Sequence, residues 1–517
     1  MQLKQLQILV TSDIHGYIMP TTFRQKIEPL GLAKVGTLIE QLREEKPTIL
    51  IDNGDLIQGS PLTYYHHAFQ EHKLDPVIEA ANLLDYDFAV FGNHEFNYGK
   101  SYLDAVIAQS NFPWLSGNIT NEDGTSYTQP YLVKEVSGIR IGFIALTTHF
   151  VTVWEEPRHI EGLSFKDAYE FANFWITQVK AHEQLDLIAL CYHGGFENDL
   201  ITGETLEATT GENQGYKMCK ELDFDLLITG HQHRELAEKL FGKSIIQPGT
   251  KGNCLGVITI EIEKCFDKQQ IHHKPSLVYV TDETPVHEGI VQQNKEVYSA
   301  TEAWLDETIG QLDTEIHFSD AFSVRVQKHP YIQLIQDIQM EMSGAPISCT
   351  ALFHDQAGGF PAKITMRHII NNYIFPNTLK VLKVSGRHIM EALEQNATYF
   401  TIDQNNQLRV SKSFYYPKPQ PYNYDMWEGI EYVMDIRKPL GQRITKALYN
   451  GEPLQPEAYY EVVMNNYRAT GAGNFPYFAE CEVIKDIQID MTELIARYFQ
   501  DHPTVESKLK KNWDILY

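Results

Sequence analysis

The chain has 517 residues, 43% of them hydrophobic, which is enough apolar material for two hydrophobic cores and predicts two or three domains. Its 43 basic and 68 acidic residues give a formal net charge of −25, which argues against polymeric nucleic acid or an anionic membrane surface as a partner. No apolar run reaches the roughly 18 residues that predict a membrane span, and the first predicted strand follows Met1 too closely for a signal peptide, so we expect a cytoplasmic protein.

Five apolar runs in the first half of the chain each end in a polar cluster of residue types that bind divalent metals. The runs cover residues 8–16, 48–55, 88–95, 187–195 and 226–233. Each predicts a short buried strand of the parallel kind, because such strands are covered on both faces and are almost continuously apolar. Ligands gather at the carboxyl ends of the strands in open α/β sheets, so we expect the five clusters to meet.

Eight polar side chains would come together at these strand ends. They are Asp13, His15, Asp55, Asn93, His94, His193, His231 and His233. Asp13 and His15 are two positions apart, as are His231 and His233, and on an extended backbone the two side chains of each pair face the same way. A single cluster of this kind is more often a turn or a cap than a ligand set, but five in register favour a metal site.

The residue types at these strand ends favour two transition-metal ions. Two carboxylates, several imidazoles and an amide, without any thiolate, suit Mn, Zn, Fe or Co better than Mg or Ca. Even seven of these eight side chains are too many ligands for one ion, and two ions about 3.5 to 4 Å apart need a bridge, for which Asp55 offers two oxygens. The positive charge of two divalent ions exceeds the negative charge of the two carboxylates. Hydroxide and phosphate would balance the remaining positive charge.

The rest of the chain is organised around a boundary near residue 285. Before it, strands alternate with helices such as the one predicted over 31–45, and after it the apolar spacing predicts a linking helix that stops at Gly310. The second half mixes a predicted helix over 331–342 with a strand over 379–385 and a stiff proline-rich loop over 415–425. The six cysteines are scattered without a CxxC pair, which favours reduced, buried thiols over disulfides.

The order and wording of the polar motifs resemble the metallophosphoesterase superfamily, in particular its branch of 5'-nucleotidases and 2',3'-cyclic-nucleotide 2'-phosphodiesterases. The matching motifs are 13–16 (DIHG), 52–62 (DNGDLIQGSPL), 92–99 (GNHEFNYG) and 230–233 (GHQH), joined in the second half by 373–379 (YIFPNTL) and 465–469 (NNYRA). The resemblance spans nearly the whole chain. It implies an α/β fold, a metallophosphoesterase-type sandwich of two mixed sheets flanked by helices, followed by an α+β nucleotide-recognition domain.

The resemblance also implies domains and metal ligands. A dimetal catalytic domain would cover residues 1–285, a linker helix region 286–320, and a 5'-nucleotidase-type C-terminal nucleotide-binding domain 321–517. Asp13, His15 and His233 would hold one divalent metal, Asn93, His193 and His231 would hold the other, and Asp55 would be shared. A water activated at these metals would attack phosphorus in line.

The remaining site residues follow from the same resemblance. His94 is the candidate to donate a hydrogen bond or proton to the leaving oxygen, and Asn97 would orient its imidazole. Tyr424 and Tyr467 would hold the base between them by stacking, with Tyr422 and Trp427 as the alternatives. Asn377 and Gly473 would belong to the same nucleotide pocket.

Three departures from the 5'-nucleotidase pattern bear on the substrate. Asn97 stands where many such enzymes have an aspartate, residues 356–360 lack the NGGGxR signature with its arginine, and residues 471–474 read GAGN, without the aspartate of GGDG. A carboxylate at Gly473 would repel a phosphate carried on the ribose hydroxyls, so its absence would leave that side of the pocket open to 2',3'-cyclic and 3'-phosphates.

We therefore expect a 2',3'-cyclic-nucleotide 2'-phosphodiesterase with 3'-nucleotidase activity that acts on small-molecule nucleotides. A 5'-nucleotidase or UDP-sugar hydrolase of the same fold is the alternative. A metal-stabilised nucleotide-binding protein without turnover is a third reading, against which the retention of His94 beside a full ligand set argues.

Overall fold

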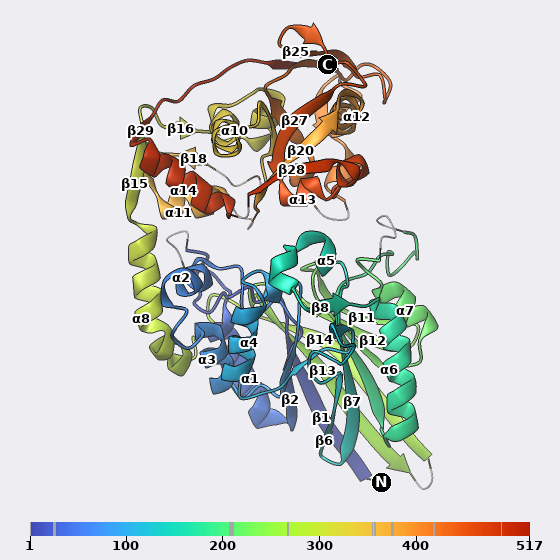
Figure 1. Ribbon diagram of the computed structural model, residues 1–517. Coiled ribbons are helices and arrows are strands. Elements are labelled where there is room, and N and C mark those ends of the chain that lie inside the picture. The colour runs from blue at the N-terminus through green and yellow to red at the C-terminus, as the bar shows by residue number, and fades with distance from the viewer. Residues whose placement is uncertain are drawn as a thin grey trace. The chain divides into compact units, whose positions relative to one another are not determined.

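The computed structural model describes residues 2–23, 27–205, 211–265, 268–353, 355, 358–373, 377–416, 419–487 and 489–517. The chain divides into two compact units, Met1–Glu302 (unit 1) and Ala303–Tyr517 (unit 2) (Figure 1). The division falls within helix α8 (Glu288–Leu305), inside the stretch 286–320 predicted as the linker.

The end of α8 differs from the prediction. We expected the helix to stop at Gly310, but it ends at Leu305, and Gly310 lies in strand β15 (Thr308–Leu312). A Cβ atom at Gly310 would lie 2.8 Å from the Cβ of Phe499 on helix α14 (Met491–Asp501). The glycine therefore serves the close packing of a strand against a helix and does not end one.

Unit 1 contains two six-stranded sheets, both mixed. The first has the order β14 (Lys268–Tyr279), β13 (Cys254–Cys265), β1 (Gln2–Thr11), β2 (Thr48–Asp52), β3 (Phe88–Val90), β4 (Trp114–Leu115). The second has the order β11 (Glu235–Leu240), β12 (Lys243–Pro248), β10 (Leu226–Thr229), β9 (Leu187–His193), β7 (Ile139–Thr147), β6 (Tyr131–Val136). Each sheet has a run of four parallel strands, β1 to β4 in the first and β12, β10, β9 and β7 in the second. The predicted pair of mixed sheets is confirmed.

The five predicted strands are β1, β2, β3, β9 and β10, and they are shared between the two sheets. Thr11 at the end of β1 pairs with Asp52 at the end of β2, and Tyr192 of β9 pairs with Thr229, the last residue of β10. Because each set of strands ends in register, the loops that follow begin side by side. All residues of β9 are buried, as expected for a strand covered on both faces.

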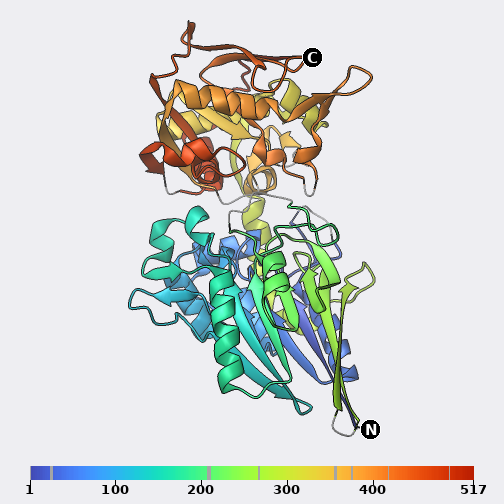
Figure 2. The same cartoon turned by 90° about the vertical axis from the view of Figure 1, so that its right-hand side faces the viewer.

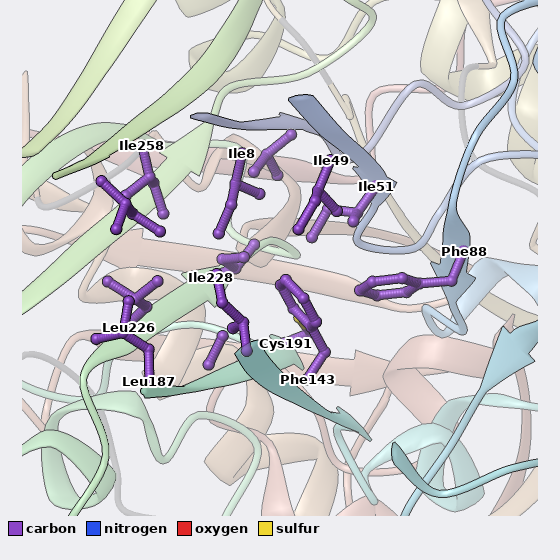
Figure 3. Packing of buried hydrophobic residues seen from close by; sticks show 14 of the residues in the cluster. Ile8, Ile49, Ile51, Phe88, Phe143, Leu187, Cys191, Leu226, Ile228 and Ile258 are labelled. Atoms are coloured by element: carbon purple, nitrogen blue, oxygen red, sulfur yellow. The ribbon is translucent and has the colours of Figure 1, made fainter. Parts of the chain in front are cut away.

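A hydrophobic core lies between the two sheets (Figure 3). Ile8, Ile49 and Phe88 from the first sheet face Phe143 and Ile228 from the second. The rings of Phe88 and Phe143 lie 5.0 Å apart, a favourable distance for an aromatic pair. This core fixes the two sheets to each other and so sets the positions of both groups of strand ends.

Helices flank the two sheets of unit 1 (Figure 1, Figure 2). They include α1 (Leu32–Glu45), α2 (Pro61–Gln70), α3 (Pro76–Leu83), α4 (Lys100–Gln109), α6 (Ala168–His182) and α7 (Gly215–Glu221). Helix α1 matches the prediction over 31–45 and buries Leu32, Val35 and Ile39 on one face. Ser60 caps the start of helix α2, because its side chain accepts a hydrogen bond from the Thr63 amide. The cap fixes the position of the end of the DNGDLIQGSPL motif.

Unit 2 is an α+β domain, as predicted. Its five-stranded sheet has the order β23 (Asp425–Glu428), β17 (Ile347–Ala351), β27 (Tyr459–Asn465), β20 (Leu379–Ser385), β28 (Glu482–Ile487). Helix α10 (Pro330–Ser343) packs on this sheet. It begins with Pro330 in its first turn and ends at Gly344, whose φ of 81° provides the left-handed cap. The helix predicted over 331–342 and the strand predicted over 379–385 are both present.

Two sequence expectations concern the environment of the protein. Among the described residues, no helix is long and apolar enough to cross a membrane. Five cysteines are described as free thiols, and four of them are buried. The expected role of the cysteines as small buried side chains agrees with these four.

Candidate metal centre

The polar clusters of the first sheet are joined by backbone hydrogen bonds. The amide of Asp13, after β1, donates to the carbonyl of Gly54, after β2, at 2.8 Å, and the amide of His15 donates to the carbonyl of Asp55 at 2.7 Å. Across the sandwich, the amide of His231 donates to Asp13 Oδ1 at 2.9 Å. The loops after β1, β2 and β10 are therefore held together by their own main chains and by one carboxylate.

Backbone conformation at the site is unusual. Five of the seven predicted metal ligands have positive φ angles, namely Asp13, His15, Asp55, His231 and His233, with values between 51° and 67°. Such angles are uncommon for residues other than glycine, and they cluster where function requires them. The two i, i+2 pairs do converge, but the predicted reason was wrong, because their backbone is left-handed at both positions and not extended.

The first group of candidate ligands is Asp13, His15 and His233, whose donor atoms all lie within 4.8 Å of one another. The Nε2 atoms of His15 and His233 are 2.9 Å apart, and His233 Nε2 lies 3.4 Å from Asp13 Oδ1. Asp13 and His15 are buried, whereas His233 is exposed. These are the three residues expected to hold one ion.

The second group is Asp55, His193 and His231, also within 4.8 Å of one another. Asn93 joins it, because its Oδ1 lies 2.9 Å from His231 Nδ1. Asp55 links the two groups, since its Oδ2 is 3.2 Å from His193 Nε2 and 3.9 Å from His15 Nε2. The other six residues expected as ligands thus lie in two groups of three, which the buried carboxylate of Asp55 links.

The protonation pattern tests whether these groups suit a metal. His15 Nδ1 donates to the Gln58 carbonyl and His193 Nδ1 to the Asn53 carbonyl, at 3.0 and 2.7 Å, so in the neutral rings Nε2 carries the lone pair. On each ring that nitrogen faces the oxygen of Asp55. A nitrogen lone pair that faces a carboxylate oxygen is stabilised when the two atoms share a cation. Backbone acceptors at the other ring nitrogen are typical of metal-bound histidines.

His231 follows the same logic with its two nitrogens exchanged. Its Nε2 donates to Glu212 Oε1 at 3.0 Å, which leaves the Nδ1 lone pair facing the carbonyl oxygen of Asn93. Sequence reasoning did not predict Glu212. Its carboxylate is the outer partner of a ligand imidazole, and no motif spacing indicates it, because a loop that precedes α7 brings it to the site.

The charges of the site fit a divalent cation. Burial lowers the pKa of His15 to about 3, so this imidazole is neutral and able to ligate. Although burial opposes ionisation, the imidazoles of His193 and His94 hold the pKa of the Asp55 carboxyl well below its usual range. Burial also lowers the pKa of His193, but the facing carboxylates outweigh it and raise that pKa to about 10. The proton there supplies positive charge that a divalent ion would displace.

Glu95 is a second residue that sequence reasoning missed. Its two carboxylate oxygens accept hydrogen bonds from the amides of Gly92, Asp55, Leu56 and Ile57. Burial, reinforced by Asp55, raises the pKa of Glu95 to about 7. The residue follows the GNH motif directly, and it ties the loop after β3 to the loop after β2.

His94 lies at the edge of the first group. Its ring centroid is 5.1 Å from that of His15, and its donor atom lies within 4.8 Å of those of His15 and Asp55. Its Nδ1 donates to Asn97 Oδ1 at 2.6 Å, as expected for an orienting residue. The Asn97 amide nitrogen in turn donates to Glu155 Oε2 at 2.6 Å. Glu155 belongs to the loop after β7, a sixth strand end that was not predicted to contribute.

The predicted base-stacking pair in unit 2 needs correction. Tyr424 has no exposed surface, because its ring stacks on Tyr399 and its hydroxyl donates to the Arg325 carbonyl. It cannot receive a base. Trp427, an alternative, is equally buried. The resemblance to the family motif identified Tyr424, but a motif match does not show whether a ring is buried or exposed.

The other alternative, Tyr422, lies beside Tyr467. Both are partly exposed, and their rings meet edge to face, with centroids 6.2 Å apart and an interplanar angle of 81°. Arg468 connects this region, because its buried guanidinium pairs with Asp425 and donates a hydrogen bond to the Tyr422 carbonyl at 2.9 Å. Asn377 is half-buried. The carbonyl of the next residue, Thr378, accepts a hydrogen bond from the backbone amide of Asn466, which precedes Tyr467.

The expectation that Gly473 leaves an open side in the pocket is wrong. Its φ is 73°, and an added Cβ would lie 2.1 Å from Asn423 Oδ1 and 2.4 Å from Arg468 Nη1. The space is therefore filled by protein. Two of the sequence predictions fall partly outside the described residues. These are residues 356 and 357 of the stretch 356–360, which lacks an arginine, and residues 374–376 of the YIFPNTL motif.

The two-sheet sandwich, the two ligand groups at its strand ends and the separate α+β unit together define a two-domain metal-dependent phosphoesterase. Residues 6–235 match the family model of calcineurin-like phosphoesterases, and residues 308–480 match that of the 5'-nucleotidase C-terminal domain. A solved structure of a Staphylococcus aureus protein provisionally assigned as a 5'-nucleotidase, in complex with alpha-ketoglutarate, is 36% identical with a TM-score of 0.91, and the match covers 99% of this chain and 100% of that one. This chain belongs to the 5'-nucleotidase family of calcineurin-like phosphoesterases, which are phosphoric ester hydrolases.

Curated relatives are similar along almost the whole chain. The 2',3'-cyclic-nucleotide 2'-phosphodiesterase/3'-nucleotidase of Haemophilus influenzae is 26% identical over 98% of this chain and 87% of its own length. The trifunctional nucleotide phosphoesterase protein of Bacillus subtilis is 28% identical over 99% of this chain. This chain spans only 39% of that larger protein.

Proposed function

We propose that this chain is a dimetal phosphohydrolase that opens 2',3'-cyclic nucleotides at the 2' position and removes the phosphate of 3'-nucleotides. The observation that carries the proposal is the pair of ligand groups joined by Asp55, with His94 at their edge. The relatives named for this activity match at 25–27% identity over 90–98% of the chain. The asparagine at position 97, where many 5'-nucleotidases have an aspartate, supports the same choice.

The proposal gives each metal ion one of the two ligand groups. One group would use Asp13, His15 and His233, the other Asn93, His193 and His231, and Asp55 would serve both. When bound, divalent ions at these places supply positive charge for the phosphoryl oxygens and activate water for in-line attack. Mn, Zn, Fe and Co all suit a ligand set of imidazoles, carboxylates and an amide.

The chain's own residues complete the reaction. Asp13 and Asp55, both buried, would hold the cations by their negative charge, and backbone acceptors fix the imidazoles of His15 and His193. His94 is positioned by Asn97 so that its Nε2 is the nitrogen that, in the charged ring, would give a hydrogen bond or a proton to the leaving oxygen.

A substrate panel tests the proposal. With Mn added, the wild type should release phosphate faster from 3'-AMP and from 2',3'-cyclic AMP, after opening it, than from 5'-AMP or a UDP-sugar. Preference for 5'-AMP would instead support a 5'-nucleotidase, the alternative that the similarity to the Staphylococcus aureus structure favours. No phosphate release from any of the four would indicate a nucleotide-binding protein without turnover.

For the base, we propose that Tyr422 and Tyr467 form the stacking pair. Stacking on an aromatic ring contributes about 1 to 3 kcal/mol per base. Tyr422→Ala and Tyr467→Ala should therefore each raise KM for all three adenine nucleotides by roughly five- to a hundredfold, with little change in the ratio between substrates. Tyr416→Ala is the matched control, because Tyr416 is an exposed tyrosine of the same proline-rich loop. Equal KM values in the control and in both variants would exclude this pair.

A further inference from the structure

The hydrogen bonds of His94 continue beyond Asn97 to a carboxylate on another loop. His94 Nδ1 donates to Asn97 Oδ1, and Asn97 Nδ2 donates to Glu155 Oε2, both at 2.6 Å. Glu155 follows the short helix α5 (Val151–Trp154) in the loop after β7. We propose that Glu155 is a positioning residue that fixes the orientation of the Asn97 amide and, through it, the tautomer of His94. The inference rests on the proposed function, in which His94 serves the leaving oxygen.

The two ends of the Asn97 side-chain amide differ in the hydrogen bonds they can make. The Asn97 side chain could present to His94 either its oxygen, which accepts, or its nitrogen, which donates. A carboxylate can only accept, so Glu155 requires the amide nitrogen to point toward it. The amide oxygen is then the atom that faces His94.

The orientation of the amide determines the proton on the ring. An oxygen at 2.6 Å from Nδ1 accepts a hydrogen bond only if Nδ1 carries a proton. Nδ1 therefore carries the proton of the neutral ring, and Nε2 holds its lone pair. If the amide were reversed, its nitrogen would donate to Nδ1, and the neutral ring would carry its proton on Nε2 instead.

The side chain of Glu155 is itself fixed, so it can determine the orientation of the Asn97 amide. Its side chain is only 6% exposed. Its second oxygen, Oε1, accepts hydrogen bonds from His159 Nδ1 at 2.8 Å and from the amide of Glu156 at 2.9 Å. The carboxylate is thus fixed by its own loop, and Asn97 adapts to it. A carboxylate at position 97 would present an acceptor to His94 in either orientation and would need no such partner.

A double-mutant cycle between positions 97 and 155 tests the inference. In Glu155→Ala the amide is free to reverse, so kcat should fall about tenfold with KM nearly unchanged, a part of the 10² to 10⁴ that general acid catalysis contributes. Adding Asn97→Asp to Glu155→Ala should recover at least fivefold in kcat, because either oxygen of the aspartate can accept the hydrogen bond from His94 Nδ1. The same Asn97→Asp change in the wild type should give no gain. Glu161→Gln, an exposed glutamate of the same loop, is the control and should keep the wild-type kcat.

The cycle separates orientation from a merely structural role. If Glu155 only stabilises its loop, Asn97→Asp will have the same effect with Glu155 and without it, and the inference is overturned. The double variant Asn97→Asp/Glu155→Gln repeats the test with a side chain of the same length at position 155. It should also recover kcat, since the glutamine amide can donate a hydrogen bond to the new carboxylate.

A second measurement does not depend on activity or on metal. Long-range proton–nitrogen spectra of metal-free protein with labelled histidine, in which the His94 signals are identified by their loss in His94→Asn, report which ring nitrogen is protonated. The Nδ1–H tautomer should dominate in the wild type and in the double variants, and both tautomers should be populated in Glu155→Ala. An unchanged tautomer in Glu155→Ala would reject the inference even if turnover changed. A wild type that shows the Nδ1–H tautomer but hydrolyses no phosphate ester would instead reject the proposed function alone.

Discussion

Replacement of Asp55 by alanine is expected to remove metal from both positions of the centre. Asp55 is 1% exposed and lies between the two ligand groups, with Oδ2 within 3.9 Å of imidazole nitrogens from each. A carboxylate that serves two cations contributes to the binding of both, so its loss should be more severe than the loss of any terminal ligand. Elemental analysis after dialysis against Mn should find close to no bound metal.

Two matched variants make this result interpretable. His233→Ala and His193→Ala each remove a ligand from one group only, so each should retain one metal better than the other. Asp55→Asn keeps the size of the side chain but removes its charge, and it should also lose both ions, which would exclude a simple packing effect. Near-full occupancy of two metals per chain in Asp55→Ala would show that Asp55 is not the bridge.

Substitution of His94 by asparagine is expected to lower turnover by about 10² to 10⁴, the usual contribution of general acid catalysis, while both metals stay bound. The structure makes the metal measurement necessary, because His94 lies close enough to His15 and Asp55 to ligate. Its Nδ1 is already engaged by Asn97, which leaves Nε2 for either role. Loss of one metal equivalent would make His94 a ligand, and unchanged turnover would remove it from the reaction.

Much of the metal centre could be predicted because it depends on strand ends. Parallel strands are apolar throughout, so the polar residue that follows each run marks the edge of a sheet, as at Asp55 and His193. The reason given for the DIH and HQH pairs did not hold, since left-handed backbone angles at Asp13 and His233 are set by contacts between loops and leave no spacing signal.

The residues that sequence reasoning missed share a physical cause. Glu95, Glu155 and Glu212 act on neighbouring groups through hydrogen bonds made across the fold, and none of them belongs to a pattern of regular spacing. The error at Tyr424 is of another kind. A tyrosine-rich loop offers several rings, and the packing of Tyr424 against Tyr399 decides that it faces inward.

The most direct test of the proposed function is a phosphorus NMR time course of 2',3'-cyclic AMP with the metal-stripped wild type before and after Mn is added. The cyclic diester should persist before Mn is added. Afterwards it should convert to 3'-AMP and then to inorganic phosphate, with 2'-AMP absent, because the 2' bond is the one that opens. Unchanged cyclic diester in protein that carries two Mn per chain, or conversion to 2'-AMP, would contradict the assignment of this centre as a 2'-phosphodiesterase and 3'-nucleotidase.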